Sequence, residues 1–289
     1  MLALKAWRDN ARYLHVNGRK VAYWESDKGA QKPILLLIHG YPTSSWDWTA
    51  IWPAIEKHFH LVALDMLGFG LSDKPREHHY SIMEQADLQE ELARQVGFGQ
   101  AHILTHDYGN TVGQELLARA LENSLGFNIS SMCFLNGGLF PEQHRARLIQ
   151  KLGLTPLGPL LGKIMSPERL RKSFDGIFGP QTKPSATEID GHWELISENN
   201  GQSVLHRLLN YIPERRNNRE RWVGALKQTA VPLRLINGGF DPVSGEHLYH
   251  YYNKQVPNPD SVLLENIGHY PHTEAAEKVT SHFLAFHGH

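Results

Sequence analysis

Six short, largely apolar runs that do not alternate with polar residues recur along this chain. They are Pro33–Ile38, Leu61–Leu64, Ile103-Leu104, Met132–Leu135, Val231–Ile236 and Ser261–Leu264. Strands of this kind are usually buried on both faces, as in a parallel sheet covered by helices. Helix-like segments follow or separate the runs, at Ser81–Val96, Gly109–Leu121, Gly245–Gln255 and His272–Phe286. This order predicts an α/β sheet with right-handed crossovers.

Local signals fix the ends of some elements. Ala11–Val16 and Arg19–Glu25 flank the dipeptide Asn17-Gly18, which is typical of a β-hairpin turn. Ser81 followed by Glu84 is a capping-box signal, and Gly97 predicts the end of that helix.

The alternation breaks between about residues 138 and 228, where helical pieces occur without a convincing strand. This insertion holds 14 Lys+Arg against 9 Asp+Glu, whereas the rest of the chain holds 15 against 21. An elaborated surface insertion would fit, but the change in charge and its place between two core strands favour a helical cap. We therefore expect a core of residues 1–137 and 229–289 with a cap of residues 138–228.

Composition narrows the class of protein. The 289 residues carry a net charge of −1, which gives no global attraction to nucleic acid or acidic membranes. The single cysteine, Cys133, lies in an apolar run and suits a core position in a reducing compartment. The chain begins without a signal-like apolar run and has no stretch of about 18 apolar residues. We expect a cytoplasmic protein with no membrane partner, and the oligomeric state stays open.

The strongest chemical signal is Asp107, which stands in a strand–turn–helix sequence, Ile103 to Leu121. This is the context of a nucleophile elbow, although Thr105 replaces its usual first glycine and aspartate replaces serine. An aspartate that only caps the following helix is the alternative.

The loop after the first core strand is His39-Gly40-Tyr41-Pro42. In a fold of this kind it supplies one oxyanion-hole amide, from Tyr41, and the residue after the nucleophile, Tyr108, supplies the other. Ordinary turn chemistry would also explain this glycine and proline.

An acid and a histidine follow in the order that such a triad requires. Asp241 lies in the loop after Val231–Ile236, and His269 lies in the loop after Ser261–Leu264. Asp241 can hold the imidazole of His269 in one tautomer, so that His269 acts as a general base. No zinc-like spacing of Cys and His and no phosphate-binding glycine loop is present, so we expect no metal and no cofactor.

Five segments resemble the epoxide hydrolase and haloalkane dehalogenase branch of the α/β hydrolases, in which an aspartate is the nucleophile. They are residues 39–48, 64–75, 106–110, 238–243 and 268–274. Residues 78–86, 135–145 and 219–226 resemble one particular member of that branch, and the resemblance covers nearly the whole chain.

The resemblance implies that Asp107 displaces a leaving group at carbon, which gives an alkyl-enzyme ester, and that water activated by His269 hydrolyses this ester. In epoxide hydrolases cap tyrosines protonate the opening epoxide, and Tyr211 matches one of the two approximately. An ordinary helix residue is the alternative for Tyr211. Haloalkane dehalogenases hold the halide with a Trp directly after the nucleophile and with a second Trp or an Asn. These positions are Tyr108 and, for the Asn type, Tyr41 here, so the chain departs from that pattern, although Trp193 of the cap could compensate.

We therefore predict a cofactor-independent hydrolase of small apolar electrophiles, with water as its second substrate and with epoxides ahead of haloalkanes. A relative that acts only by binding is one alternative, and the complete set Asp107, Asp241 and His269 argues against it. A cofactor-free oxygenase is another alternative that the sequence leaves open.

Overall fold

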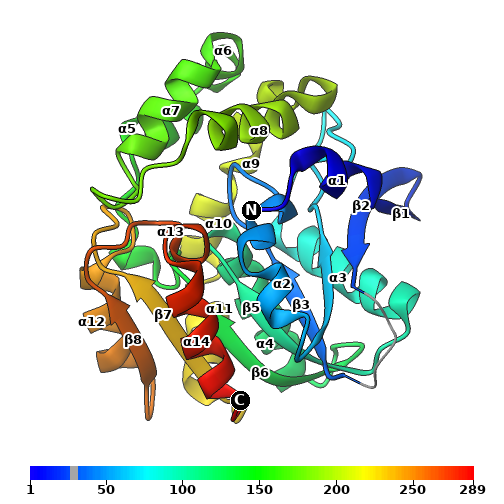
Figure 1. Ribbon diagram of the computed structural model, residues 1–289, viewed down its shortest axis with the longest axis vertical. Coiled ribbons are helices and arrows are strands. Elements are labelled where there is room, and N and C mark those ends of the chain that lie inside the picture. Colours follow the sequence, from blue (N-terminus) through cyan, green and yellow to red (C-terminus); the bar gives the residue numbers. More distant parts are fainter. Residues whose placement is uncertain (27–31) are drawn as a thin grey trace.

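A single sheet runs through the molecule in the order β1-β2-β4-β3-β5-β6-β7-β8 (Figure 1). In the computed structural model, which describes residues 1–26 and 32–289, the strands are β1 (Arg12–Val16), β2 (Arg19–Glu25), β3 (Ile34–Ile38), β4 (His60–Leu64), β5 (Gln100–Thr105), β6 (Asn128–Phe134), β7 (Leu233–Gly238) and β8 (Asp260–Leu264). Strands β1, β2 and β4 pair antiparallel, and every other pair is parallel. The predicted α/β fold class is confirmed.

The apolar runs fill both faces of this sheet. Leu36 and Ile38 of β3 pack in one core cluster, which also contains residues of α3 and α4. Leu35 and Leu37 pack in a second cluster with residues of α2 and α14. Because successive strand residues point to opposite faces, a strand covered on both sides has no polar face. Cys133 of β6 is buried in the second cluster, as predicted.

The local signals predict the hairpin and α3 well. Asn17 and Gly18 both have positive φ, 50° and 76°, as a tight hairpin turn between β1 and β2 requires. Ser81 accepts a hydrogen bond from the backbone N–H of Glu84 at the start of α3, and Gly97 ends α3 with a φ of 86°.

Helices of the core flank the sheet on both sides (Figure 1). They are α1 (Leu4–Asp9), α2 (Trp52–Ile55), α3 (Ile82–Val96), α4 (Tyr108–Leu121), α12 (Glu246–Gln255), α13 (Pro271–Glu274) and α14 (Ala276–Phe286), with a 3-10 helix η1 (Ser45–Ala50). The sequence predicts one helix over His272–Phe286, and this is wrong in one respect. Ala275 leaves helical geometry, with a φ of −141°, and divides the segment into α13 and α14.

Residues 138–228 contain helices and no strand. These are η2 (Pro141–Gln143), α5 (Leu148–Gly153), α6 (Gly158–Ile164), α7 (Pro167–Asp175), α8 (Ala186–Ser197), η3 (Glu198–Ser203), α9 (Leu205–Leu208), α10 (Tyr211–Asn217) and α11 (Arg219–Gln228). Helices α5 to α8 stand above the sheet in Figure 1, whereas α11 packs against α4. Trp222 of α11 donates a hydrogen bond to the Glu115 carboxylate of α4 at 2.8 Å. None of the helices in residues 1–26 and 32–289 combines the length and apolarity needed to cross a bilayer.

Candidate active site

Asp107 lies at the tip of a sharp turn between β5 and α4. Its φ and ψ are 49° and −106°, a backbone conformation that is uncommon for a residue with a side chain. Gly109 makes the turn possible, because a Cβ atom there would lie 2.3 Å from the carbonyl oxygen of Ile38. The Asp107 side chain makes no capping hydrogen bond to α4, so the alternative of a simple helix cap does not describe it.

The loop after β3 meets this turn. The backbone N–H of Tyr41 donates a hydrogen bond to Asp107 Oδ1 at 3.0 Å. Gly40 allows this approach, since a Cβ atom there would lie 2.7 Å from the Cβ atom of Asp107. His39 stabilises the loop through two hydrogen bonds. Its Nδ1 donates to the carbonyl of Gly40, and its Nε2 accepts from the N–H of Met66.

Two further features of this loop and of the elbow bear on the predicted oxyanion hole. The peptide bond between Tyr41 and Pro42 is cis. Tyr108 is the first residue of α4, where a backbone N–H has no acceptor within the helix. The amides of Tyr41 and Tyr108 thus come from the two sites at which the sequence predicts an oxyanion hole.

His269 stands between the two predicted carboxylates. Its Nδ1 donates to Asp241 Oδ2 at 2.7 Å, and its Nε2 lies 3.4 Å from Asp107 Oδ2. All three side chains are buried. The structure therefore brings together three residues that are 28 to 162 positions apart in the sequence.

Asp241 is held by more groups than the sequence suggests. Besides His269, it accepts hydrogen bonds from the N–H of Val243, from the N–H and hydroxyl of Ser244, and from Asn136 Nδ2 at 3.1 Å. Asn136 also accepts from the N–H of Gly238 at 2.6 Å and so ties the ends of β6 and β7 together. Asn136 belongs to none of the predicted site motifs, although a polar residue directly after the apolar run of β6 is a signal that could identify it.

Asp107, Asp241 and His269 shift one another's pKa values in the direction that favours the charged form of each group. Burial disfavours the ionised form of Asp107, but its hydrogen bond to His269 and the charge of His269 outweigh this and lower its pKa. The pKa of Asp241 is lowered for the same reason. Burial opposes protonation of His269, yet the two carboxylates raise its pKa to about 10. At neutral pH the resting site is therefore an imidazolium between two carboxylates.

A cavity of about 110 Å³ lies above Asp107 and His269. The core contributes Tyr41, Pro42 and Val243 to its wall, together with these two catalytic candidates. The cap segment contributes the apolar side chains of Ile149, Leu161, Met165, Leu170, Ile177, Leu205 and Leu209. It also contributes the polar side chains of Arg147, Gln150, Arg169, Ser173 and His206. An apolar substrate with one or two polar atoms fits this lining.

Tyr211 is buried next to the cavity rather than in its wall. Its hydroxyl accepts a hydrogen bond from Gln150 Nε2 at 3.3 Å, and Gln150 does line the cavity. Its ring lies 6.3 Å from the ring of Tyr41 and 5.0 Å from that of Tyr108. Burial and, next, the charge of Asp107 raise its pKa well above the ordinary value, so the phenol keeps its proton. No local signal in the sequence pointed to Gln150.

Of the three residues considered for halide binding, Tyr41 lines the cavity, whereas the side chains of Tyr108 and Trp193 lie elsewhere. The ring of Tyr108 is fully buried against Phe69 and Tyr211, and its hydroxyl interacts with Gln85. Trp193 is partly buried and packs against the core. Neither side chain is among the described residues that line the cavity.

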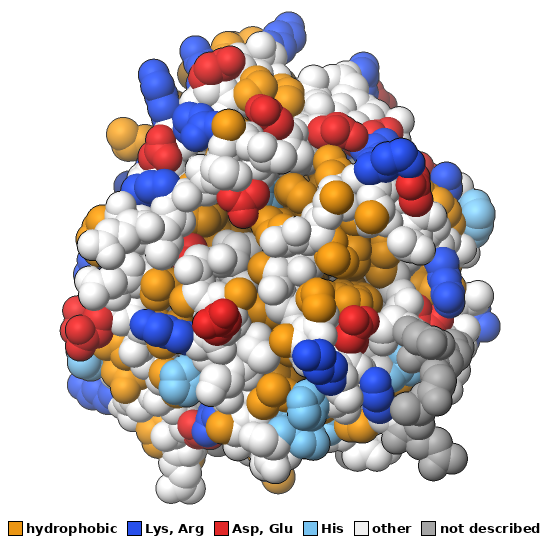
Figure 2. Space-filling view, viewed as in Figure 1, with side chains coloured by type: hydrophobic (Ala, Val, Ile, Leu, Met, Phe, Trp, Pro, Cys, Tyr) orange, Lys and Arg blue, Asp and Glu red, His pale blue; other side chains and the backbone are white. Residues whose placement is uncertain are grey.

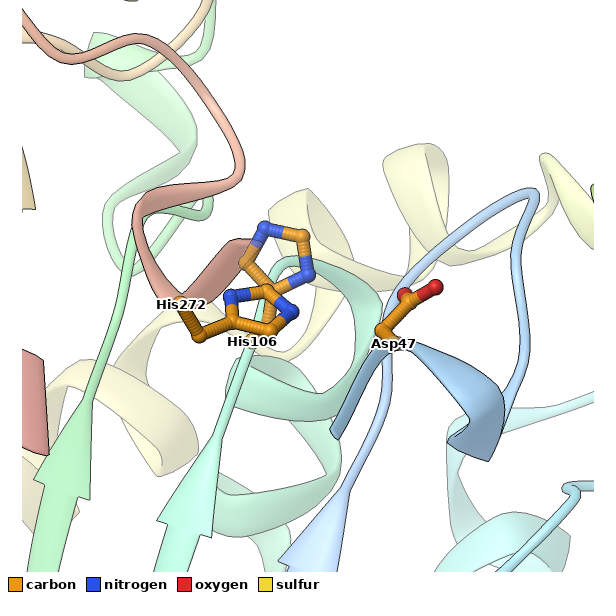
Figure 3. Close-up of side chains that lie close together, drawn as sticks. All are labelled: Asp47, His106 and His272. Atoms are coloured by element: carbon orange, nitrogen blue, oxygen red, sulfur yellow. The ribbon is translucent and has the colours of Figure 1, made fainter. Parts of the chain in front are cut away.

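A second buried group lies behind Asp107, with ligand-type atoms of Asp47, His106 and His272 all within 4.8 Å of one another (Figure 3). Thr43 donates a hydrogen bond to Asp47, and His106 Nε2 donates to the carbonyl of His269 at 2.8 Å. Burial lowers the pKa of His106 to about 3 and that of His272 well below the ordinary value. Burial raises the pKa of Asp47 well above its ordinary value, so this carboxyl favours its protonated form. Neutral imidazoles and a protonated carboxyl can be satisfied by hydrogen bonds with ordered water. None of the three lines the cavity, so this group lies outside the chemistry of Asp107.

Comparisons with known proteins agree with this architecture. A family model described as alpha/beta hydrolase fold matches residues 33–276. Mesoderm-specific transcript homolog protein of Bos taurus is 41% identical over 98% of this chain and 88% of its own, and a putative hydrolase, LipZ, of Mycobacterium tuberculosis is 38% identical over 94% of each. The first of these is the member of the branch that residues 78–86, 135–145 and 219–226 resemble, so that resemblance is confirmed.

Two solved structures show the same fold at low sequence identity. The epoxide hydrolase CorEH superposes with a TM-score of 0.78 at 19% identity, and it covers 96% of this chain and 98% of its own. The haloalkane dehalogenase DbeA from Bradyrhizobium elkani has a TM-score of 0.78 at 21% identity, with the same two coverages.

Proposed function

The chain belongs to the α/β hydrolase fold family, and from this premise we propose that it is a cofactor-independent hydrolase with Asp107 as its nucleophile. The observation that carries the proposal is the position of one carboxylate. Asp107 accepts from the Tyr41 N–H at 3.0 Å on one oxygen, and its other oxygen lies 3.4 Å from His269 Nε2. An ionised carboxylate needs no base to attack sp³ carbon, and this one faces an apolar cavity.

In the first step, Asp107 Oδ2 attacks a carbon of the substrate, and the bond from that carbon to its leaving oxygen breaks. Oδ2 is the attacking atom because Oδ1 is held by the Tyr41 amide. The new C–O bond makes an ester of Asp107, and the leaving oxygen receives a proton from an acid in the cavity wall. The carboxylate thereby loses its negative charge.

In the second step, His269, which has first passed its resting proton back to the acid of the cavity wall, removes a proton from water, and the water oxygen attacks the ester carbonyl carbon of Asp107. The negative charge that develops on Oδ1 is stabilised by the N–H groups of Tyr41 and Tyr108. Collapse breaks the bond to the alcohol oxygen, which takes the proton from His269. Loss of the Asp107 charge in the first step lowers the pKa of His269, since that charge helps to keep it protonated. The base is thus released when it is needed.

Among electrophiles, the site favours an epoxide. An opening epoxide leaves an alkoxide, which requires a proton donor, whereas a halide requires only donors around an anion. Tyr211 keeps its proton, and it accepts rather than donates in its bond with Gln150. Rotation of Gln150 would open a path from this hydroxyl to the cavity. Of the candidate halide donors, the side chains of Tyr108 and Trp193 do not line the cavity, and Tyr41 lines it with a backbone N–H that is already bonded to Asp107.

The decisive experiment separates the two steps. His269→Gln retains a nucleophile that can be alkylated and loses the base that clears the ester. After incubation with a panel of epoxides, haloalkanes and aryl esters, intact-protein mass spectrometry of this variant is expected to show an epoxide adduct, and peptide mapping is expected to place it on Asp107.

His250→Gln is the matched control, because His250 is exposed and lies outside the cavity. We expect this control to turn over substrate as the wild type does and to accumulate no adduct. An unmodified His269→Gln protein, with a substrate that the wild type hydrolyses, would favour direct attack by water. If only haloalkanes form adducts, the leaving group is a halide and the assignment of epoxides as substrates is wrong. Turnover of none of these classes by the wild type would favour a binding protein or an oxygenase.

A further inference from the structure

The outer surface of the cap exposes many large apolar side chains. In the part of the chain that the structure describes, twelve large hydrophobic residues are classed as exposed, and seven of them lie within residues 148–164. They are Leu148, Ile149, Leu152, Leu154, Leu157, Leu160 and Ile164. Leu148 is 77% exposed and Leu157 is 57% exposed, so most of the surface of these side chains faces solvent. Scattered exposed leucines are normal, but a contiguous group marks an interaction surface.

Helical geometry gathers these side chains on the outside. Leu157, Leu160 and Ile164 are spaced as i, i+3 and i+7 and share one face of α6 and the residue before it, and Leu148 and Leu152 share one face of α5. Leu161 follows Leu157 by four residues and therefore lies at the edge of the same face, where it lines the cavity. The large apolar side chains of α6 and of Leu157 therefore form one stripe at the outer end of the molecule, and Lys163 lies outside this stripe (Figure 1). An apolar stripe of this kind is normally covered by another surface.

The charges along the segment that carries this patch are mostly positive. Residues 144–172 contain seven Lys and Arg and a single acidic residue, Glu168. Lys151, Lys163, Arg169 and Lys172 are exposed. Basic side chains appear beside apolar ones at the same end of the molecule in Figure 2. The overall net charge of −1 conceals this local excess.

We propose that α5, α6 and the loop between them dock onto an anionic lipid surface, with the apolar side chains in the interface and the basic side chains at the headgroups. Apolar residues on one side with Lys and Arg around them are the composition of interfacial membrane helices. A second copy of the chain fits less well, because a symmetric contact would bring the exposed cations of the patch against the same cations of the other copy.

The cavity supplies a second argument for a bilayer. Ile149 is 40% exposed on the patch and also lines the cavity, and Leu161 lines the cavity at the edge of the apolar stripe of α6. The patch therefore lies over the apolar wall of the cavity. Apolar molecules concentrate in a bilayer, so docking at this place would put the cavity next to its source of substrate. The docking itself does not depend on Asp107 chemistry, and binding can be measured without turnover.

Vesicle flotation of the full chain tests the proposal. Wild type is expected to float with vesicles of phosphatidylcholine mixed with phosphatidylglycerol, and less with phosphatidylcholine alone. The variant Leu157→Ser/Leu160→Ser/Ile164→Ser is expected to lower the partition coefficient about 100-fold, because three apolar side chains lose their burial. The variant Lys151→Glu/Lys163→Glu is expected to lower it about ten-fold on anionic vesicles only, and added salt should do the same to wild type.

Leu2→Ser/Leu121→Ser is the matched control, since both leucines are exposed and lie far from the cap in the sequence. It should float as wild type does. None of the three leucine and isoleucine positions lines the cavity, so turnover of a water-soluble substrate is expected to stay unchanged in the triple variant. Absence of wild-type flotation, or equal flotation of wild type and triple variant, would overturn the proposal. So would a dimer in sedimentation that the triple variant loses while vesicles bind neither protein.

Discussion

The two walls of the cavity are built in different ways. On the core side, the backbone of Asp107 is confined by the glycines around it, and Asp241 accepts from five groups. On the cap side, Leu161, Met165 and Leu205 contribute shape and apolar surface. Directional bonds fix atoms to within fractions of an ångström, whereas apolar contacts tolerate repacking. From this difference we expect the core wall to determine the reaction and the cap wall to determine which substrates are accepted.

The first way to break this comparison is to change the core wall by one atom. Asp107→Asn keeps the shape of the side chain, and asparagine tolerates a positive φ, so the fold should be retained. Turnover should fall by about 10⁴-fold or more, since a neutral amide is a poor nucleophile and no ester can form. Steady-state kinetics and thermal unfolding measure both quantities. Full activity in this variant would remove Asp107 from the mechanism.

The core wall was also the more predictable of the two. Asp107, Asp241 and His269 each follow a short apolar strand, and the carboxyl ends of parallel strands meet at one edge of the sheet. Order along the chain and local turn residues were therefore enough to nominate them. Thr105, in place of a glycine, weakened the pattern without altering the turn, because its hydroxyl donates to Asn110 within it.

The arrangement of the cap wall could not be predicted from the local sequence. Helical spacing says that Leu161 and Leu160 point to different sides, but not which side faces the cavity. Tyr211 was nominated as a cavity acid, and the structure places it behind Gln150 instead. Packing of short helices against each other decides both points, and no propensity or motif encodes it. The break at Ala275 likewise reflects tertiary packing rather than a Gly or Pro signal.

A second test concerns Tyr211, which belongs to the cap and packs against two residues of the core. Tyr211→Phe removes one hydroxyl and keeps the ring packed against Tyr41 and Tyr108. Epoxide turnover should fall roughly 10²-fold, which is the lower range for one general acid. Rapid-quench measurement should assign the loss to formation of the ester and leave ester hydrolysis unaffected. If turnover is unchanged, epoxide hydrolysis remains the proposed reaction, and Gln150 or water becomes the candidate proton donor.

A third test uses pH to separate the two steps on the core wall. Hydrolysis of the ester requires neutral His269, so its rate should rise about ten-fold per pH unit below the pKa and then level off. That pKa should lie below the value of about 10 that His269 has in the resting site, because esterified Asp107 carries no charge. Ester formation requires ionised Asp107, whose pKa is lowered, and should be flat above pH 5. Rapid-quench mass spectrometry across pH measures both rates, and an ester hydrolysis rate that falls with rising pH would contradict the role of His269.

The smallest expected effect is that of a substitution in the cap wall, and it tests most directly whether the two walls have different roles. Leu161→Ala removes apolar surface from the cavity at a half-buried position, so the loss of stability should be small. Substrate and transition state lose the same contact, which raises KM and leaves kcat unchanged. A loss of roughly 1 kcal/mol of apolar burial corresponds to about a five-fold rise in KM for a substrate that fills the cavity. A small epoxide that does not reach Leu161 should be turned over as before, and it serves as the control. A large fall in kcat for both substrates would mean that the cap positions the reacting atoms, and the division of labour between the two walls would then be wrong.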